Sequence, residues 1–76
     1  MNWIDGVGVR PEAVNIASQG RKAVITGVTY LGSFCHVAMT LADGGEAIAA
    51  QVPPGTALQP GQTVCVTWNR EDEVRV

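Results

Sequence analysis

The sequence predicts an all-β fold, a small closed or partly closed barrel of about six short strands with one helical turn after the first strand. Three observations support this prediction. Apolar residues alternate with other residues in short runs, glycines stand where the runs bend or turn, and 76 residues are too few for two packed sheets. Since 46% of the residues are hydrophobic, we expect one folded domain over residues 1–76, with a modest core.

The first predicted strand is Gly6–Arg10, in which Val7 and Val9 lie on one side. Pro11 ends this strand, because proline lacks the backbone N–H that a strand ladder needs, and it suits the first position of a helical turn. Glu12 then lies near the N-terminus of that turn, where a negative charge is favoured. Residues 15–22 follow as a predicted polar loop.

Residues 24–52 are predicted to form three strands joined by two tight turns, at Gly32-Ser33 and at Asp43-Gly44-Gly45. Glycine supplies the positive φ that hairpin turns need without a steric cost. Two-residue loops at Gly32-Ser33 and Gly44-Gly45 predict these cross-strand partners: Tyr30 with Cys35, Val28 with Val37, Thr26 with Met39, Val24 with Leu41, Leu41 with Ile48, Met39 with Ala50 and Val37 with Val52. One surface of the three strands is then apolar except at Thr26, and this pattern determines which face is buried.

The opposite surface of these strands is small or mildly polar and carries no charge. It comprises Ile25, Gly27, Thr29, Leu31, Phe34, His36, Ala38, Thr40, Ala47, Ala49 and Gln51. An ordinary solvated sheet face would carry lysine and glutamate. Two interpretations remain open: a barrel wall partly covered by the rest of the chain, or a contact surface for another domain.

The C-terminal third continues the pattern of strands and turns. Residues 53–62, with three prolines and two glycines, predict an extended connection with a turn at Pro60-Gly61. Next come a strand at residues 63–68, a charged turn at 69–72 and a last strand at 73–76 with Val74 and Val76 in line. We expect Trp3 and Ile4 to dock on the body. The predicted core comprises Val28, Val37, Met39, Leu41, Ile48, Val52, Val64, Val66 and Trp68, with Tyr30 also pointing inward.

Composition and spacing exclude several kinds of site. The formal charge of −2 disfavours phosphate-backbone binding, which depends on basic patches. Cys35 and Cys65 lack CxxC spacing, and their strand positions point them to opposite sides, so we expect two free thiols. Gly6-x-Gly8 lacks the third glycine and the flanking elements of a dinucleotide loop. We expect no catalytic, cofactor or metal site, no membrane span and no secretory leader.

Four motifs in order resemble the TOBE domain, the transport-associated OB module. They are GVRPEAV, VTYLGSFCHVAMTL, DGGEAIAAQVP and LQPGQTVCVTW, and the resemblance covers residues 6–76. In that family an RPE corner follows the first strand, a YLG turn joins two barrel strands, and a PG precedes a V-x-V-x-W strand. This sequence matches at Arg10-Pro11-Glu12, Tyr30-Leu31-Gly32, Pro60-Gly61 and Trp68.

The resemblance implies an OB-like barrel that forms the C-terminal part of the ATP-binding subunit of a bacterial ABC importer, of the polyamine, ferric iron or sulfate type. ATP and Mg²⁺ would bind in an N-terminal ATPase domain outside this chain, which contains no GxxxxGK[ST]. We therefore expect no ATP hydrolysis by this chain alone. The resemblance also implies a cytoplasmic location at the inner face of the membrane. It further implies a regulatory role through contacts with the ATPase domain and a second ATPase subunit.

The residues proposed for such contacts are Phe34, Ala38, Ala47 and Ala49 on the uncharged face, and Arg10 and Glu12 at the corner, which could pair with each other or with a partner. The isolated domain would be a monomer or a weak homodimer. Two alternatives remain. Molybdate-type TOBE modules bind oxyanions, but Ser18-Gln19-Gly20-Arg21 matches their SARN-like stretch poorly. OB barrels also bind single-stranded nucleic acid, which requires aromatic platforms and a basic groove.

Overall fold

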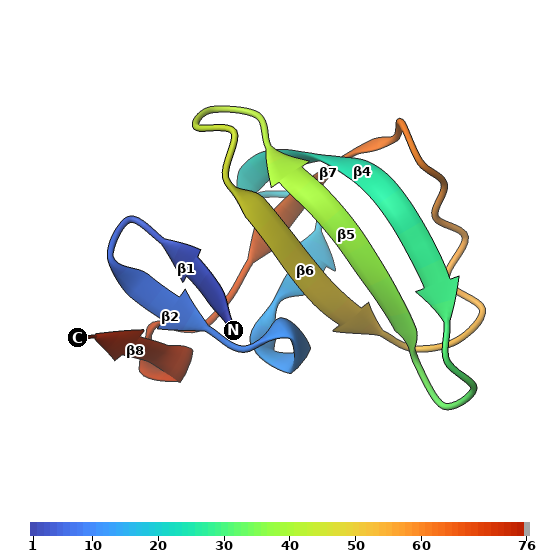
Figure 1. The fold of residues 1–76 in the computed structure, drawn as a ribbon, viewed down its shortest axis with the longest axis horizontal. Coiled ribbons are helices and arrows are strands. Elements are labelled where there is room, and N and C mark those ends of the chain that lie inside the picture. Colours follow the sequence, from blue (N-terminus) through green and yellow to red (C-terminus); the bar gives the residue numbers. More distant parts are fainter. Residues whose placement is uncertain (76) are drawn as a thin grey trace.

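The computed structural model describes residues 1–75; Val76, predicted to align with Val74, lies outside the described residues. The predicted all-β, barrel-like fold is confirmed (Figure 1). The strands are β1 (Asn2–Ile4), β2 (Val7–Val9), β3 (Asn15–Ala17), β4 (Arg21–Tyr30), β5 (Cys35–Leu41), β6 (Ala47–Val52), β7 (Thr63–Thr67) and β8 (Glu73–Arg75). Two single-turn 3-10 helices complete the fold, η1 (Pro11–Ala13) and η2 (Arg70–Asp72).

The strands form two antiparallel sheets, so the expectation that 76 residues are too few for two packed sheets is wrong; the second sheet fits because its strands are only three residues long. The larger has the order β3-β7-β4-β5-β6, and the smaller has the order β1-β2-β8 (Figure 1). The chain has more strands than predicted because β1 and β3 were not anticipated. In particular, the predicted polar loop over residues 15–22 is wrong, since Asn15–Ala17 pairs with β7 and Arg21 already begins β4. Asn15–Ala17 contains a single large apolar residue, Ile16, so no alternation indicates a strand there.

The first central hairpin has the predicted turn and a β-bulge that was not predicted. Gly32 has a φ of +85°, and the N–H of Leu31 donates to the carbonyl of Phe34 at 2.9 Å, so Gly32-Ser33 is the predicted two-residue loop. The predicted pairs Tyr30 with Cys35 and Val28 with Val37 are confirmed. A bulge between residues 25 and 27 then shifts the register by one.

The bulge overturns two predicted pairs and explains the one polar position on the predicted core face. Ile25, instead of Thr26, lies opposite Met39, and Ala23, instead of Val24, lies opposite Leu41. Ile25 is consequently 1% exposed, whereas Thr26 is outside, where its hydroxyl donates to the carbonyl of Ala38 at 3.2 Å. The prediction of Ile25 on the outer surface is therefore wrong.

The second hairpin closes through a longer loop than predicted. The N–H of Leu41 donates to the carbonyl of Glu46 at 2.9 Å, and the N–H of Gly45 donates back to the carbonyl of Leu41 at 2.9 Å. The resulting partners are Met39 with Ile48, Val37 with Ala50 and Cys35 with Val52. The predicted partners are wrong by two residues, but a shift of two leaves every side chain on its predicted face.

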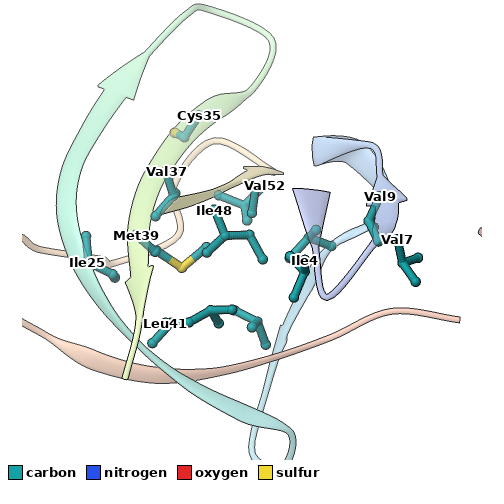
Figure 2. Close-up of a cluster of buried hydrophobic side chains, with 14 residues drawn as sticks. Ile4, Val7, Val9, Ile25, Cys35, Val37, Met39, Leu41, Ile48 and Val52 are labelled. Carbon is teal, nitrogen blue, oxygen red and sulfur yellow. The ribbon is translucent and has the colours of Figure 1, made fainter. Parts of the chain in front are cut away.

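The core lies between the two sheets, and most of its predicted members are buried. Val37, Met39, Leu41, Ile48, Val52 and Val66 are buried as predicted, while Val28, Val64 and Trp68 are only partly buried at its margin. The N-terminal segment adds Ile4, Val7, Val9 and Val14, and Figure 2 shows Ile4 directed toward Ile48 of β6. Pro11 opens η1 as predicted, and η1 packs against β6.

Two further predictions concern Tyr30 and the thiols. Tyr30 is 65% exposed, so its predicted inward position is wrong: it lies opposite Cys35 at the end of the sheet, beyond the core that its strand covers. Cys35 is buried and Cys65 half-buried, and both are free thiols. Among the residues described, no helix is long and apolar enough to cross a membrane.

Candidate protein-contact surfaces

The outer face of strands β4, β5 and β6 is the first candidate surface. We define it as the side chains opposite the core from Thr29 to Gln51, namely Thr29, Leu31, Phe34, His36, Ala38, Thr40, Ala47, Ala49 and Gln51. None of these residues is an Asp, Glu, Lys or Arg. The bulge turns Ala23 and Ile25 inward and so places Thr26, Val24 and the exposed Lys22 on the outer side of β4. The outer side is therefore uncharged over the defined part, and a lysine lies beyond it on β4.

The two registers bring most of the proposed contact residues together. Ala38 lies directly opposite Ala49, and Ala47 lies opposite Thr40. Ala47 is exposed, while Ala38 and Ala49 are half-buried between neighbouring side chains. A partner could approach the backbone closely at this alanine cluster, because methyl groups add little height to a sheet.

Phe34 lies apart from the alanine cluster, at the end of the hairpin that joins β4 and β5. It is half-buried, and the neighbouring Tyr30 and Leu31 are 65% and 52% exposed. Tyr30 pairs with the buried Cys35 and so projects from the opposite side of the sheet, which means that it borders this surface at the hairpin end without belonging to it. Aromatic side chains at the margin of a contact can anchor a partner, so the hairpin end extends the candidate surface.

The free edge of β6 is partly covered by a side chain that the sequence did not single out. Asn2 is 7% exposed; its Nδ2 donates to the carbonyl of Ala49 at 2.8 Å, and its Oδ1 accepts from the N–H of Ala49 at 2.8 Å. One side-chain amide thus replaces both bonds that a further strand would make at Ala49. A contact with the outer face must therefore use its side chains rather than strand pairing at this residue.

Arg10 and Glu12, the remaining proposed contact residues, lie elsewhere. Both are exposed and border a hollow of about 320 Å³ with Glu71, Asp72 and Val74. Within residues 1–75 neither side chain forms an ion pair, so the expected pairing between them is not made. The structure therefore separates the outer-face residues from the corner residues.

Arg21, the first residue of β4, connects two loops near another shallow hollow. Its guanidinium lies 3.1 Å from a carboxylate oxygen of Asp5 and 3.1 Å from one of Asp43. The hydrogen bond to Asp43 raises the pKa of Arg21, and the charge of Asp43 and the contacts with Asp5 act in the same direction. Trp68 and Glu73 line the adjacent hollow of about 270 Å³, where the indole Nε1 donates to the Glu73 carboxylate at 2.9 Å.

Over residues 1–75, no group of three or more His, Cys, Asp or Glu side chains is placed to hold a metal ion. When the chain was compared with curated protein sequences, none matched it. The sequence model of the TOBE domain family matches residues 7–76, which includes every strand except β1. The chain therefore belongs to the TOBE domain family.

Proposed function

We propose that this TOBE domain is an accessory, regulatory domain of the ATP-binding subunit of an ABC importer, in which its uncharged outer face contacts the ATPase domain or a second subunit. The observation that carries the proposal is the absence of Asp, Glu, Lys and Arg from the defined part of the outer face, from Thr29 to Gln51, together with the alanine cluster of Ala38, Ala47 and Ala49. The family match supports the domain type. We also propose that the importer transports a solute of the polyamine, ferric iron or sulfate type.

The physical argument is one of desolvation. Charged groups lose hydration when a partner covers them, so the core of a protein interface is depleted of them. The alanine cluster loses little on being covered, and Leu31 and Phe34 supply larger apolar side chains at one end. One small sheet gives an interface below the standard size of about 1,600 Å². The contact would therefore depend on the ATPase domain to raise its effective concentration.

ATP hydrolysis would take place in the ATPase domain, with ATP and Mg²⁺ bound outside this chain, at the cytoplasmic face of the membrane. The full-length reading frame is the first test. A GxxxxGK[ST] segment encoded upstream of residue 1 would agree with the proposal, since that loop holds the nucleotide phosphates. An intact reading frame without one would contradict it.

The second test introduces a charge into the outer face of the full-length subunit. Ala47→Arg is the variant of choice because Ala47 is exposed and its substitution leaves the core and the Asn2 contact in place. Ala57→Arg is the matched control, since Ala57 is an exposed alanine in the connection between β6 and β7. We expect Ala47→Arg to alter subunit pairing or the regulation of ATP hydrolysis, and Ala57→Arg to leave both unchanged. Equal behaviour of the two folded variants would show that the outer face is only a barrel wall.

No observation favours the two alternatives. Arg21, the basic residue of the Ser18–Arg21 stretch, is already engaged by Asp5 and Asp43, which leaves an oxyanion without a free guanidinium there. Tyr30 offers an exposed aromatic ring for nucleic acid, but the outer face beside it lacks the basic groove that such binding requires. A low-salt mobility-shift assay with single-stranded DNA separates this alternative from the protein-contact proposal.

A further inference from the structure

The smaller sheet has an exposed apolar row on the side that faces away from the core. Its inner side carries the buried residues Ile4, Val7 and Val9. On its outer side the register aligns Trp3 with Gly8 and Gly8 with Val74, one residue from each of β1, β2 and β8. Trp3 is 52% exposed and Val74 is 44% exposed, and Met1 beside them is 54% exposed.

Gly8 makes this row continuous. A Cβ atom at position 8 would lie 2.5 Å from the sulfur of Met1 and 3.1 Å from the indole ring of Trp3. Because glycine lacks that atom, the two side chains can lie over the middle strand of the sheet. The Trp3 ring thus covers backbone while half of its own surface remains exposed. A half-exposed tryptophan held in place by its neighbours is a common anchor in protein interfaces.

The row leads into a negatively charged hollow at its β8 end. Val74 lines the hollow of about 320 Å³ already described, whose other borders include Arg10, Glu12, Glu71 and Asp72. The hollow is therefore lined by three carboxylates and by one guanidinium, that of Arg10. Within residues 1–75 none of these four side chains forms an ion pair. The surface therefore combines an apolar row with an uncompensated negative potential at one end.

We propose that this outer side of the β1-β2-β8 sheet docks a protein segment carrying an aliphatic or aromatic side chain next to a lysine or arginine. The apolar side chain packs on Trp3 and Val74, and the basic group lies in the hollow near Glu71 and Asp72. Charge complementarity selects this occupant over a second copy of the chain, which has a net charge of −2 and would bring a second acidic hollow. The inference concerns a different surface from the outer face of β4–β6 and does not depend on the importer proposal.

Trp3 itself reports on this contact. The chain has two tryptophans, so Trp68→Phe makes Trp3 the sole indole emitter. The probes are three synthetic eight-residue peptides, one with a Leu-Leu-Lys-Lys centre, one with Leu-Leu-Glu-Glu and one with Ser-Ser-Lys-Lys. At low salt we expect only the Leu-Leu-Lys-Lys peptide to shift the Trp3 emission to the blue. Backbone amide shifts of the unsubstituted chain, measured by NMR, give the same test if Trp68→Phe perturbs folding.

Variants assign the two halves of the site. Glu71→Gln and Asp72→Asn are each expected to weaken binding of the Leu-Leu-Lys-Lys peptide about two- to fivefold, and added salt is expected to reduce this difference. Val74→Ser is expected to weaken binding at any salt concentration, and Ala57→Ser, at an exposed position outside both surfaces, to leave it unchanged. An equal response to the Leu-Leu-Glu-Glu peptide, amide shifts outside β1, β2, β8 and the hollow, or self-association of the chain through Trp3 without any peptide would each overturn the inference.

Discussion

The two sheets of this domain are specified by different kinds of interaction. The central strands β4, β5 and β6 of the larger sheet are 10, 7 and 6 residues long, and β5 alternates strictly between buried and half-buried side chains. The smaller sheet consists of three-residue strands contributed by both ends of the chain. Its attachment includes the contact of Asn2 with Ala49 and the ion pairs of Arg21, which bridge segments distant in sequence.

The difference indicates where the domain is expected to open first. Regions with short strands and few buried contacts open at lower free energy than the central part of a core. The smaller sheet buries Ile4, Val7 and Val9 against the larger sheet (Figure 2), so it is not independent of the core. Its polar attachments nevertheless add less stability than burial of the β5 side chains. The three predictions below test this order, from the largest effect to the smallest.

The largest effect is expected for Met39→Ala in the middle of β5. Met39 is 1% exposed and lies opposite both Ile25 and Ile48, so its truncation leaves a cavity that neighbours from two strands cannot easily fill. We expect a loss of about 2–5 kcal/mol in the free energy of unfolding, measured by urea denaturation. In a domain this small that loss would leave little folded protein.

Thr29→Ala provides the control for Met39→Ala, because Thr29 is an exposed residue of the neighbouring strand β4. Its effect is expected to stay within about 0.5 kcal/mol. If Met39→Ala had an effect as small as this control, the buried layer of β5 would not be the main source of stability, and the contrast between the two sheets would be wrong.

The central strands of the larger sheet were the part whose buried faces could best be predicted from the sequence, for a physical reason. Alternation along β5 and the glycine turn at Gly32-Ser33 are local signals, and they identified the buried side of Val37, Met39 and Leu41 correctly. The bulge at Thr26 was not predicted. Its one indication in the sequence was that Thr26 was the single polar residue on the otherwise apolar predicted core face. β3 exists only through pairing with the distant β7. β1 instead forms a tight hairpin with the adjacent β2, and its signal was the turn pair Asp5-Gly6, whose φ angles of +53° and +78° were not anticipated.

For the candidate surfaces, too, only the features that depend on local sequence could be predicted. The uncharged character of the outer face could be predicted because it depends only on residue type and strand parity. Its geometry could not, since the longer second loop is what places Ala38 opposite Ala49. The role of Asn2 and the row of Trp3, Gly8 and Val74 depend on how the two ends of the chain meet. No local pattern contains that information.

A smaller effect is expected for Asn2→Ala, which removes the side chain that bridges β1 and β6. The substitution leaves the N–H and the carbonyl of Ala49 without their partner in a partly buried place. We expect a loss of about 1–3 kcal/mol in the free energy of unfolding. Hydrogen exchange at the Ala49 amide should also accelerate, and the exposed edge of β6 should make the chain more prone to association.

Two further variants at asparagine positions sharpen this result. Asn2→Asp keeps an acceptor for the N–H of Ala49 but places a second carboxylate oxygen against its carbonyl at a buried position, so a loss at least as large as that of Asn2→Ala is expected. Asn15→Ala is the control, because Asn15 is exposed and makes only a long local bond of 3.4 Å to the carbonyl of Ala13. Equal losses for Asn2→Ala and Asn15→Ala would show that the amide contact does not hold the smaller sheet in place.

The smallest effect is expected for Arg21→Met, which removes the ion pairs with Asp5 in the β1–β2 turn and Asp43 in the β5–β6 loop. The Arg21 side chain is 30% exposed and the two carboxylate side chains are 72% and 62% exposed, so solvent screens both pairs. We expect a loss of about 0.2–1 kcal/mol in the free energy of unfolding, which about 1 M salt should largely remove. Arg70→Met is the control, since Arg70 is exposed and forms no ion pair within residues 1–75.

The pH dependence of the Arg21 contribution follows from the direction of its pKa shift. The pKa of Arg21 is raised in the folded state, chiefly by the hydrogen bond to Asp43. A raised pKa means that the stabilisation is fully present below the unfolded pKa of arginine and is lost only as the pH rises through the folded value. Titration of Arg21 should therefore cause no change in the difference between Arg21→Met and the parent from about pH 6 to pH 9. A loss as large as that of Asn2→Ala, unaffected by salt, would instead make Arg21 a principal attachment of the smaller sheet.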